Sequence, residues 1–456
     1  MTTPLWTATE LRDATGGALA GEPVVTGIAI DSRAVQPGDL FVALRDVRDG
    51  HDFVPAAFAN GAAVAMIDRD APGGETLRVA DTLAGLAALG GAGRARSSAR
   101  IAAITGSVGK TTTKDMLRHG LGSFGATHAA VASYNNHWGL PLTLARMPRG
   151  TEYGVLEIGM NHRGEIAPLA RLARPHVVAI TQIGAAHIGH LGSLEEIAAE
   201  KADILEGLSA GGVAVLPRDG FFDGIAARAR GLGASVIGVG EDAGADARLV
   251  SAECGPLSST AEVTLHGQAL RLSIGAPGRH LVLNALTALA TAAALGVDAA
   301  RFAASLSSFR PGAGRGARVP FAVPGGEALL LDESYNGQPP AMRAALAVLG
   351  TQQAARRLAV LGDMRELGDF GPALHEGLLP DVVGNADLVF CCGAQMRRLY
   401  DALPEALRGA HAETSEELAP LVRNAVRPGD VVLVKGSLGT RMAAVVGALK
   451  SQGAHP

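Results

Sequence analysis

The clearest chemical signal in the sequence is the glycine-rich run TGSVGKTTT at residues 105–113. It follows an apolar segment and precedes a helical pattern, which is the context of a phosphate-binding loop. Backbone N–H groups from Gly106 to Lys110 can converge on phosphate oxygens at the start of that helix. The Lys110 ammonium would contact the β and γ phosphates, and the Thr111 hydroxyl would ligate Mg²⁺. The loop therefore predicts ATP binding, although Ile104 stands where the longer GxxxxGK[ST] pattern has its first glycine.

Three residues outside the loop could complete a metal site. Glu157 ends an apolar strand-like segment, so its carboxylate would emerge at the carboxyl edge of a parallel sheet, near the phosphates. His187 follows another such segment and could coordinate a second ion as a neutral imidazole. Lys201 lies in a helical pattern, where an exposed lysine is the ordinary expectation. Taken alone, the residues leave open a solvated carboxylate, a structural histidine and a solvated lysine.

A polar loop at YNNHWGLP carries Asn135 and Asn136 before a glycine and a proline. It suits contacts with a polar substrate, and ordinary turn chemistry explains it equally well.

The elements that must position these residues form two series of apolar strands alternating with helical patterns, which indicates parallel sheets. The strand-like segments of the first series are 101–106, 153–159, 177–183 and 211–216, and those of the second are 327–336, 357–364, 386–393 and 430–437. Before them, short β-like runs and helical patterns predict a smaller α/β domain. The second series resembles a Rossmann-like domain, although no GxGxxG opens it.

Two stretches rich in glycine and arginine divide the chain. Residues 89–100 lack hydrophobic periodicity, as linkers usually do, and residues 309–319 separate the two strand series. We therefore expect an α/β protein of three domains, with boundaries at 1–97, 98–311 and 312–456.

Composition excludes several classes of function. The 456 residues are 48% hydrophobic and 18% charged, with a formal net charge of −4, so a nucleic-acid partner is not favoured. The cysteines Cys254, Cys391 and Cys392 form neither a disulfide framework nor a metal knuckle. No leader-like start and no apolar run long enough to cross a bilayer is present, so we expect a soluble, cytoplasmic protein without membrane insertion.

Nine motifs, taken in order, resemble the ATP-dependent Mur ligases of peptidoglycan synthesis over essentially the whole chain. They are TGSVGKTTTK, YNNHWGLPLTL, LEIGMNHRGEI, AAHIGHLGSLEEIAAEKADI, GRHLVLNALTALA, PGAGRGAR, LLDESYN, LGDMRELG and KGSLGTRM. TGxxGKT is the loop form that the family uses, which accounts for Ile104. Within the family, the later motifs look like the branch that adds D-alanyl-D-alanine to UDP-N-acetylmuramoyl-tripeptide, and the DNPR-type motif of the diaminopimelate-adding branch is absent.

The resemblance implies a small N-terminal UDP-binding domain, a central P-loop ATPase domain and a C-terminal Rossmann-like domain. It implies amide-bond formation in which ATP converts the tripeptide carboxylate to an acyl phosphate that the dipeptide amine attacks. The implied cofactors are ATP and two Mg²⁺ ions, and we expect a monomer. One departure is YNGQPP where this branch usually reads YNANP, which affects Gly337 and Gln338.

Roles for individual residues also follow from the resemblance. It assigns Lys110 to catalysis and ATP binding. It makes Glu157, His187 and Lys201 catalytic residues and also metal ligands, together with Thr111. The resemblance further implies that Lys201 is carbamylated, so that it offers anionic oxygens. The remaining residues implied for ATP are Gly106, Ser107, Val108, Gly109, Thr112, Asn284, Arg315, Asp332 and Asn336. Those implied for the other substrates are Asp31, Ser32, Arg33, His51, Asp52, Asn135 and Asn136.

Two alternatives remain at this point. The chain could be the neighbouring Mur ligase that adds the third amino acid, or an ATP-hydrolysing switch or binding module that performs no ligation.

Overall fold

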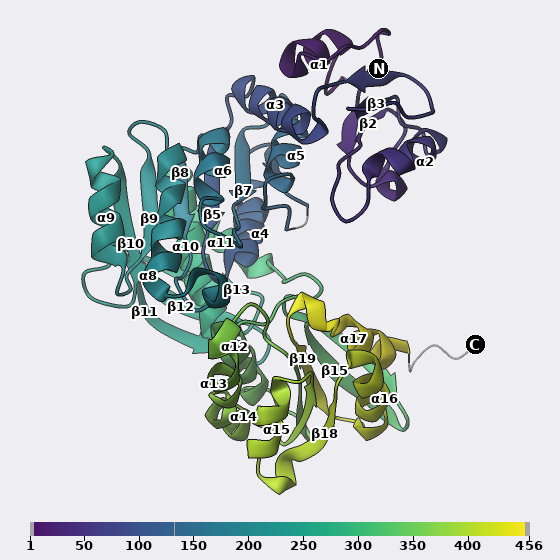
Figure 1. Ribbon diagram of the computed structural model, residues 1–456. Helices are drawn as coiled ribbons and strands as arrows, with labels where there is room; N and C mark the ends of the chain where they lie inside the picture. Colours follow the sequence, from purple (N-terminus) through teal and green to yellow (C-terminus); the bar gives the residue numbers. More distant parts are fainter. Residues whose placement is uncertain (1–3, 132, 452–456) are drawn as a thin grey trace.

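The computed structural model describes residues 4–131 and 133–451, which fold around three separate sheets (Figure 1). The α/β class and the three-domain architecture expected from the sequence are confirmed. In Figure 1 the N-terminal sheet lies at the upper right, the nine-stranded central sheet at the left and the six-stranded C-terminal sheet below them. None of the helices in these described ranges is both long and apolar enough to cross a membrane.

The N-terminal sheet has four parallel strands in the order β1-β2-β3-β4. Its strands are β1 (Gly27–Ala29), β2 (Asp39–Val42), β3 (Val64–Ile67) and β4 (Thr76–Arg78). The helical elements are α1 (Ala8–Thr15), η1 (Ser32–Ala34), η2 (Gly50–Phe53), α2 (Val54–Ala59) and α3 (Thr82–Ala95). Strands β2 and β3 are buried along their whole length, as expected for parallel strands covered on both faces.

The central sheet has the order β13-β12-β11-β10-β9-β8-β5-β7-β6. Strands β5 (Arg100–Thr105), β6 (Thr127–Ala129), β7 (Tyr153–Glu157), β8 (Val177–Ile180), β9 (Val213–Pro217) and β10 (Ser235–Gly240) are parallel, and β11 (Ala247–Cys254), β12 (Ser259–Leu265) and β13 (Gln268–Ile274) extend the sheet as an antiparallel meander. The chain proceeds from β5 to β6 and β7 on one side and then to β8 on the other. The carboxyl end of β5 is therefore a topological switch point, where open α/β sheets bind ligands.

Two helix layers cover the central sheet. One face packs against α4 (Lys110–Leu121), α10 (Arg279–Ala294), α11 (Ala299–Ser305) and η4 (Leu306–Ser308), and the other against α5 (Gly139–Ala145), α6 (Ile166–Ala173), α7 (Ile188–Leu191), α8 (Leu194–Ala202), η3 (Asp203–Gly207) and α9 (Phe222–Gly231). These layers bury the apolar sides of strands whose carboxyl ends carry the loop at 105–110.

The C-terminal sheet has the order β14-β15-β19-β16-β17-β18, antiparallel only between β14 and β15. Its strands are β14 (Ala317–Val323), β15 (Gly326–Glu333), β16 (Arg357–Gly362), β17 (Leu388–Cys392), β18 (Arg408–Ala412) and β19 (Val431–Lys435). The helical elements are α12 (Pro339–Gly350), η5 (Gly368–Phe370), α13 (Gly371–Glu376), α14 (Leu379–Asn385), α15 (Met396–Ala402), η6 (Glu405–Leu407), α16 (Ser415–Ala425), η7 (Leu438–Thr440) and α17 (Ala443–Lys450).

The structure corrects the expectation that residues 89–100 form an irregular linker. Helix α3 continues to Ala95, and two of its glycines, Gly90 and Gly93, pack against α5 of the central domain. A Cβ atom on Gly90 would lie 2.9 Å from the backbone of Pro141, and one on Gly93 would lie 2.4 Å from the carbonyl oxygen of Leu144. The glycines therefore permit a close helix crossing. Beside it, the buried Trp6 indole N–H donates to the carbonyl of Ala145 at 2.9 Å.

Candidate active site

The loop between β5 and α4 has the backbone that a phosphate cradle requires. Gly106 and Gly109 have φ of 148° and 85°, in the region that favours glycine, and α4 begins at Lys110. A Cβ on Gly109 would lie 2.5 Å from the Asn284 amide oxygen, so the glycine also makes room for α10. Ser107 anchors the loop, since its hydroxyl donates to the carbonyl of Gly184 at 2.9 Å and accepts from that residue's N–H at 3.0 Å.

The Lys110 side chain lies over its own loop, with Nζ donating to the Gly106 carbonyl at 2.6 Å. Burial lowers the pKa of Lys110, and the nearby Glu157 carboxylate acts in the opposite direction. A nucleotide phosphate would supply the anionic partner that offsets this desolvation.

A cavity of about 440 Å³ lies beside the loop, between the central and C-terminal domains. We call it the nucleotide cavity. Its central-domain wall includes Val108, Gly109, Thr112 and Asn284, and its C-terminal wall includes Gly314, Arg315, Glu333, Asn336 and Lys435.

Asp332 lies outside the nucleotide cavity, contrary to its implied role. Its carboxylate accepts from the Ser334 hydroxyl at 2.7 Å and lies 3.7 Å from Nζ of Lys450 in α17. The next residue on strand β15, Glu333, faces the cavity and forms a 3.1 Å ion pair with Lys435 at the end of β19. Sequence reasoning missed both Glu333 and Lys435, although the DES and KGS motifs contain them.

Glu157 ends β7 beside the phosphate-binding loop, and 1% of its surface is exposed. Its carboxylate accepts from the Thr111 hydroxyl at 2.8 Å and from the Asn135 amide at 2.7 Å. Both donors are neutral, and among the described residues no side chain forms a salt bridge with this carboxylate. A buried anion held only by neutral donors fits a cation bound next to it. The hydrogen bond from the Asn135 amide orients this carboxylate.

The other two implied metal ligands differ in position. The His187 ring lines a cavity of about 240 Å³ that also contains Lys110, Thr111, Glu157 and the loop at 159–165; we call it the reaction cavity. Lys201 is on α8 and is 1% exposed, which corrects the solvated position that its helical pattern predicted. Burial, and secondarily the charge of Lys110, lower the pKa of Lys201 well below its usual value.

His187 contacts the C-terminal domain. Its Nδ1 lies 2.6 Å from a carboxylate oxygen of Glu366, and this contact lowers the pKa of Glu366. Within residues 4–131 and 133–451, no three His, Cys, Asp or Glu side chains are grouped as a metal site. The protein's own contribution to a metal would therefore centre on Glu157 and Thr111, with phosphate oxygens completing the shell, as is usual for Mg²⁺.

A third cavity, of about 680 Å³, separates the N-terminal sheet from the loop at 134–138. We call it the N-terminal cavity. Asp31, Ser32 and Arg33 line it, together with Arg45, Arg48, Tyr134, Asn136, His137 and Trp138. Hydrogen bonds from Arg33 hold the pKa of Asp31 at about 2.

His51 and Asp52 lie outside the N-terminal cavity, although they were expected to contact substrate. His51 is 3% exposed, and its ring nitrogens contact Asp49 at 2.6 Å and the backbone N–H of Asp68 at 3.2 Å. It therefore ties η2 to the end of β3, while the exposed Asp52 lies 3.5 Å from Arg69.

The three cavities share walls. Asn136 lines both the N-terminal and the reaction cavity, and Val108, Thr112, Arg315 and Asn336 line both the reaction and the nucleotide cavity. Arg315 comes from the segment that connects the two larger domains; its guanidinium donates to the Ser133 hydroxyl at 2.7 Å and lies 4.2 Å from the centre of the Tyr335 ring.

The YNGQPP departure has a structural reason. A Cβ on Gly337 would lie 2.8 Å from the backbone of Gly436 and Ser437, and the Ser437 hydroxyl donates to the Gly337 carbonyl at 2.9 Å. Gln338 precedes α12 and is 3% exposed. The two loops of the C-terminal domain therefore approach more closely than a side chain at residue 337 permits.

This arrangement places a phosphate-binding loop beside a buried carboxylate at the boundary of two α/β domains, which is typical of a nucleotide-dependent enzyme. Family models match three parts of the chain: the Mur ligase family catalytic domain at residues 24–83, the Mur ligase middle domain at 104–292, and the Mur ligase glutamate ligase domain at 322–438. The chain belongs to the Mur ligase family and is an ATP-dependent ligase.

Full-length relatives agree with the family models. UDP-N-acetylmuramoyl-tripeptide--D-alanyl-D-alanine ligase of Bacillus subtilis is 32% identical over 93% of each chain, and that of Escherichia coli is 32% identical over 98% of this chain and 99% of the relative. The crystal structure of MurF from Acinetobacter baumannii aligns with a TM-score of 0.86 at 31% identity, covering 98% of this chain and 99% of that one. MurF from Thermotoga maritima in complex with ADP aligns with a TM-score of 0.77 at 26% identity, covering 93% and 97%.

Proposed function

We propose that the chain joins D-alanyl-D-alanine to UDP-N-acetylmuramoyl-tripeptide at the expense of ATP. The observation that carries this proposal is the shared lining of the three cavities, because one enzyme must bring a UDP-linked acid, a nucleotide and an amine together. The relatives named for this reaction match the full chain, which disfavours both the neighbouring ligase and the switch.

The N-terminal cavity would hold the UDP part of the precursor, so that its peptide extends past Asn136 into the reaction cavity. ATP would occupy the nucleotide cavity, with its γ-phosphoryl group at Lys110. A carboxylate oxygen of the tripeptide attacks the γ-phosphorus and the bond to ADP breaks, which forms an acyl phosphate. The dipeptide amine then attacks the acyl carbon, loses a proton, and inorganic phosphate leaves. The Lys110 and Arg315 cations offset the charge of one anion attacking another.

Glu157 and Thr111 fit Mg²⁺, and we propose them as its protein ligands, with His187 as the ligand at a second ion. Bound there, Mg²⁺ would neutralise phosphate charge. The chain's own residues arrange this site: Asn135 holds one oxygen of Glu157 and leaves the carboxylate facing the loop.

We propose that Lys201 is carbamylated. An amine must be uncharged to react with carbon dioxide, and the burial that lowers the pKa of Lys201 favours this neutral form. The modified side chain would present oxygens instead of an ammonium near Lys110, and would relieve the repulsion between the two cations.

We also propose that the enzyme acts as a monomer. Its use of ATP supports a cytoplasmic location.

The substrate assignment is tested by phosphate release. With UDP-N-acetylmuramoyl-tripeptide and ATP, release should depend on added D-alanyl-D-alanine and should not be sustained by diaminopimelate or L-lysine. Faster ligation of a single amino acid onto a UDP-dipeptide precursor would move the chain to the neighbouring branch. ATP hydrolysis that ignores every peptide substrate would favour the switch instead.

A further inference from the structure

Two short segments with the same pattern meet between the central and C-terminal domains. His187, Ile188 and Gly189 begin α7, and Glu366, Leu367 and Gly368 lead into η5. Each segment consists of a polar residue, an aliphatic residue and a glycine in that order. The three positions of one segment lie opposite the corresponding three positions of the other. We call their meeting the docking contact.

The polar residues provide two links across the docking contact. The His187 ring lies 2.6 Å from the Glu366 carboxylate, and the Gly189 N–H donates to the Glu366 carbonyl at 3.0 Å. His187 and Glu366 have φ of 63° and 66°, a left-handed conformation that residues other than glycine adopt rarely. Such conformations persist where the surrounding contacts hold them.

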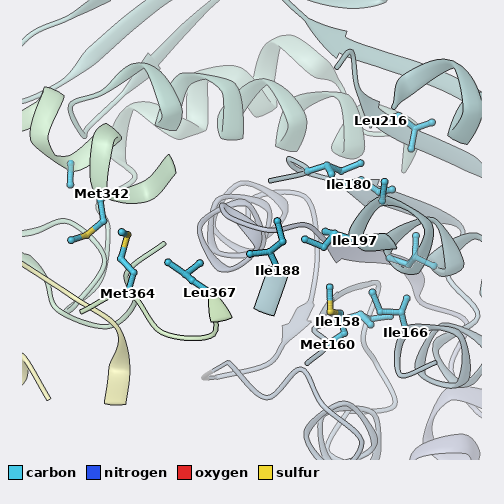
Figure 2. Packing of buried hydrophobic residues seen from close by; sticks show 14 of the residues in the cluster. Ile158, Met160, Ile166, Ile180, Ile188, Ile197, Leu216, Met342, Met364 and Leu367 are labelled. Carbon is cyan, nitrogen blue, oxygen red and sulfur yellow. The ribbon is translucent and has the colours of Figure 1, made fainter. Parts of the chain in front are cut away.

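The aliphatic residues and the glycines close the docking contact. Ile188 is 8% exposed and Leu367 is 2% exposed, and they belong to one hydrophobic cluster that also includes Met364. Figure 2 shows Ile188 and Leu367 facing each other, with Met364 beside Leu367. A Cβ on Gly189 would lie 2.5 Å from the backbone nitrogen of Gly368, so the two backbones meet with no room for a side chain.

We propose that the docking contact holds the C-terminal domain in register and that Glu366 is a positioning residue for the ligase reaction, acting through the His187 imidazole. A carboxylate on one ring nitrogen fixes the orientation of the other, as partners of metal-bound histidines do. Because Glu366 belongs to the C-terminal domain, the ring is oriented only while that domain is docked. Docking of the C-terminal domain therefore completes the reaction cavity and, at the same time, places Arg315 and Glu333 at the nucleotide cavity.

The role of His187 as a metal ligand rests on the proposed function, whereas the docking role of the contact does not. The two parts are therefore tested with different variants. Gly189→Ala acts directly on docking, because alanine suits the helical backbone of α7 and the atoms nearest to the new methyl group all belong to the facing segment. Gly224→Ala in α9, where nothing lies within 4 Å of the added Cβ, is the matched control.

Docking is measured without nucleotide or substrate, by amide hydrogen exchange and small-angle X-ray scattering. We expect the backbone amide of residue 189, whose partner lies across the contact, to exchange at least about tenfold faster in Gly189→Ala than in the unaltered protein, and we expect a larger radius of gyration. Gly224→Ala should match the unaltered protein. Unchanged exchange and scattering in a folded Gly189→Ala protein would refute the docking role, whatever the enzyme's substrate is.

Positioning is measured with Glu366→Ala and Glu366→Gln, against the exposed Glu376→Gln as control. Both Glu366 variants keep the carbonyl that Gly189 binds, so hydrogen exchange at the contact should change little. In the ADP-bound protein, affinity for the second Mn²⁺ ion, followed by electron paramagnetic resonance, should fall about tenfold or more in Glu366→Ala and less in Glu366→Gln. The KM for the UDP substrate should not change. Equal Mn²⁺ affinity in Glu366→Ala, Glu366→Gln and the control Glu376→Gln would overturn the positioning role and leave the ligase assignment intact.

Discussion

Two glycines of α3, two residues apart, should respond in opposite directions to the same substitution. A Cβ on Gly91 would meet only a side-chain carbon of Leu172 at 3.5 Å, an ordinary van der Waals contact. A Cβ on Gly93 would lie 2.4 Å from the Leu144 carbonyl oxygen and 3.4 Å from Cα of Ala145, which belong to the backbone of α5. The two sites share one helix, so the comparison isolates packing from helix propensity.

The expected magnitudes follow from this geometry. Alanine is favoured over glycine inside a helix by about 1 kcal/mol, so Gly91→Ala should stabilise the protein by about that amount. Gly93→Ala receives the same benefit, but overpacking costs about 1–3 kcal/mol, and the short contact with a backbone atom places it at the upper end, for a net loss of about 2 kcal/mol.

Scanning calorimetry of the unliganded protein can separate the two variants. The midpoint temperature of a unit of this size changes by about 2–4 °C for each kcal/mol of unfolding free energy. The midpoint of the transition that includes the N-terminal and central domains should therefore rise by about 2–4 °C for Gly91→Ala and fall by about 4–8 °C for Gly93→Ala. Gly93→Ala should also raise the KM for the UDP substrate more than the KM for ATP. A Gly93→Ala protein that melts at or above the unaltered protein would refute the packing role of this glycine.

Three further predictions concern the site and the thiols. Lys110→Ala should lower kcat by about 10²–10³-fold, because the fixed positive charge beside the nucleotide phosphates is removed. Near-normal turnover of this variant would refute the ATP-site assignment. Lys201→Ala should fold normally, lose most activity, and recover part of it with added short-chain carboxylates; activity retained at limiting Mg²⁺ would contradict the carbamate. Burial raises the pKa of the Cys391 thiol well above its usual value and that of Cys392 to about 12. Only the half-buried Cys254 should therefore react with a thiol reagent at pH 8 before unfolding, and three thiols should react after it.

The features that the sequence predicted correctly depend on neighbours along the chain. Each expected strand of the central and C-terminal sheets is present, since a buried parallel strand is a short apolar run bounded by turns. The phosphate-binding loop and Glu157 at the end of β7 are equally local patterns. Their proximity follows from one rule, that the carboxyl ends of parallel strands share an edge.

The features that sequence reasoning missed depend on residues far away along the chain. Gly90 and Gly93 look like linker residues because composition does not distinguish flexibility from a tight helix crossing, and their partners on α5 are about fifty positions later. Asp332 and Glu333 are adjacent on β15, so their side chains point to opposite faces, and only the completed sheet shows that Glu333 faces the nucleotide cavity. Lys201 and His51 are likewise buried by elements that cannot be identified from the sequence pattern around each residue.

The two domain junctions differ in a way that suits the proposed reaction. The N-terminal and central domains meet through a buried indole, a glycine-lined helix crossing and the Arg96 guanidinium 3.7 Å from the Trp6 ring, all within one continuous packing interface. The C-terminal domain meets the central domain at the docking contact, which belongs to a hydrophobic cluster with residues from both domains, and through the hydrogen bond from Arg315 to Ser133. The nucleotide cavity lies at this second junction, and its walls come from both domains. The precursor's UDP part would therefore be held at the junction with the helix crossing, while the nucleotide and the proposed metal would lie at the junction that must open to exchange ADP for ATP.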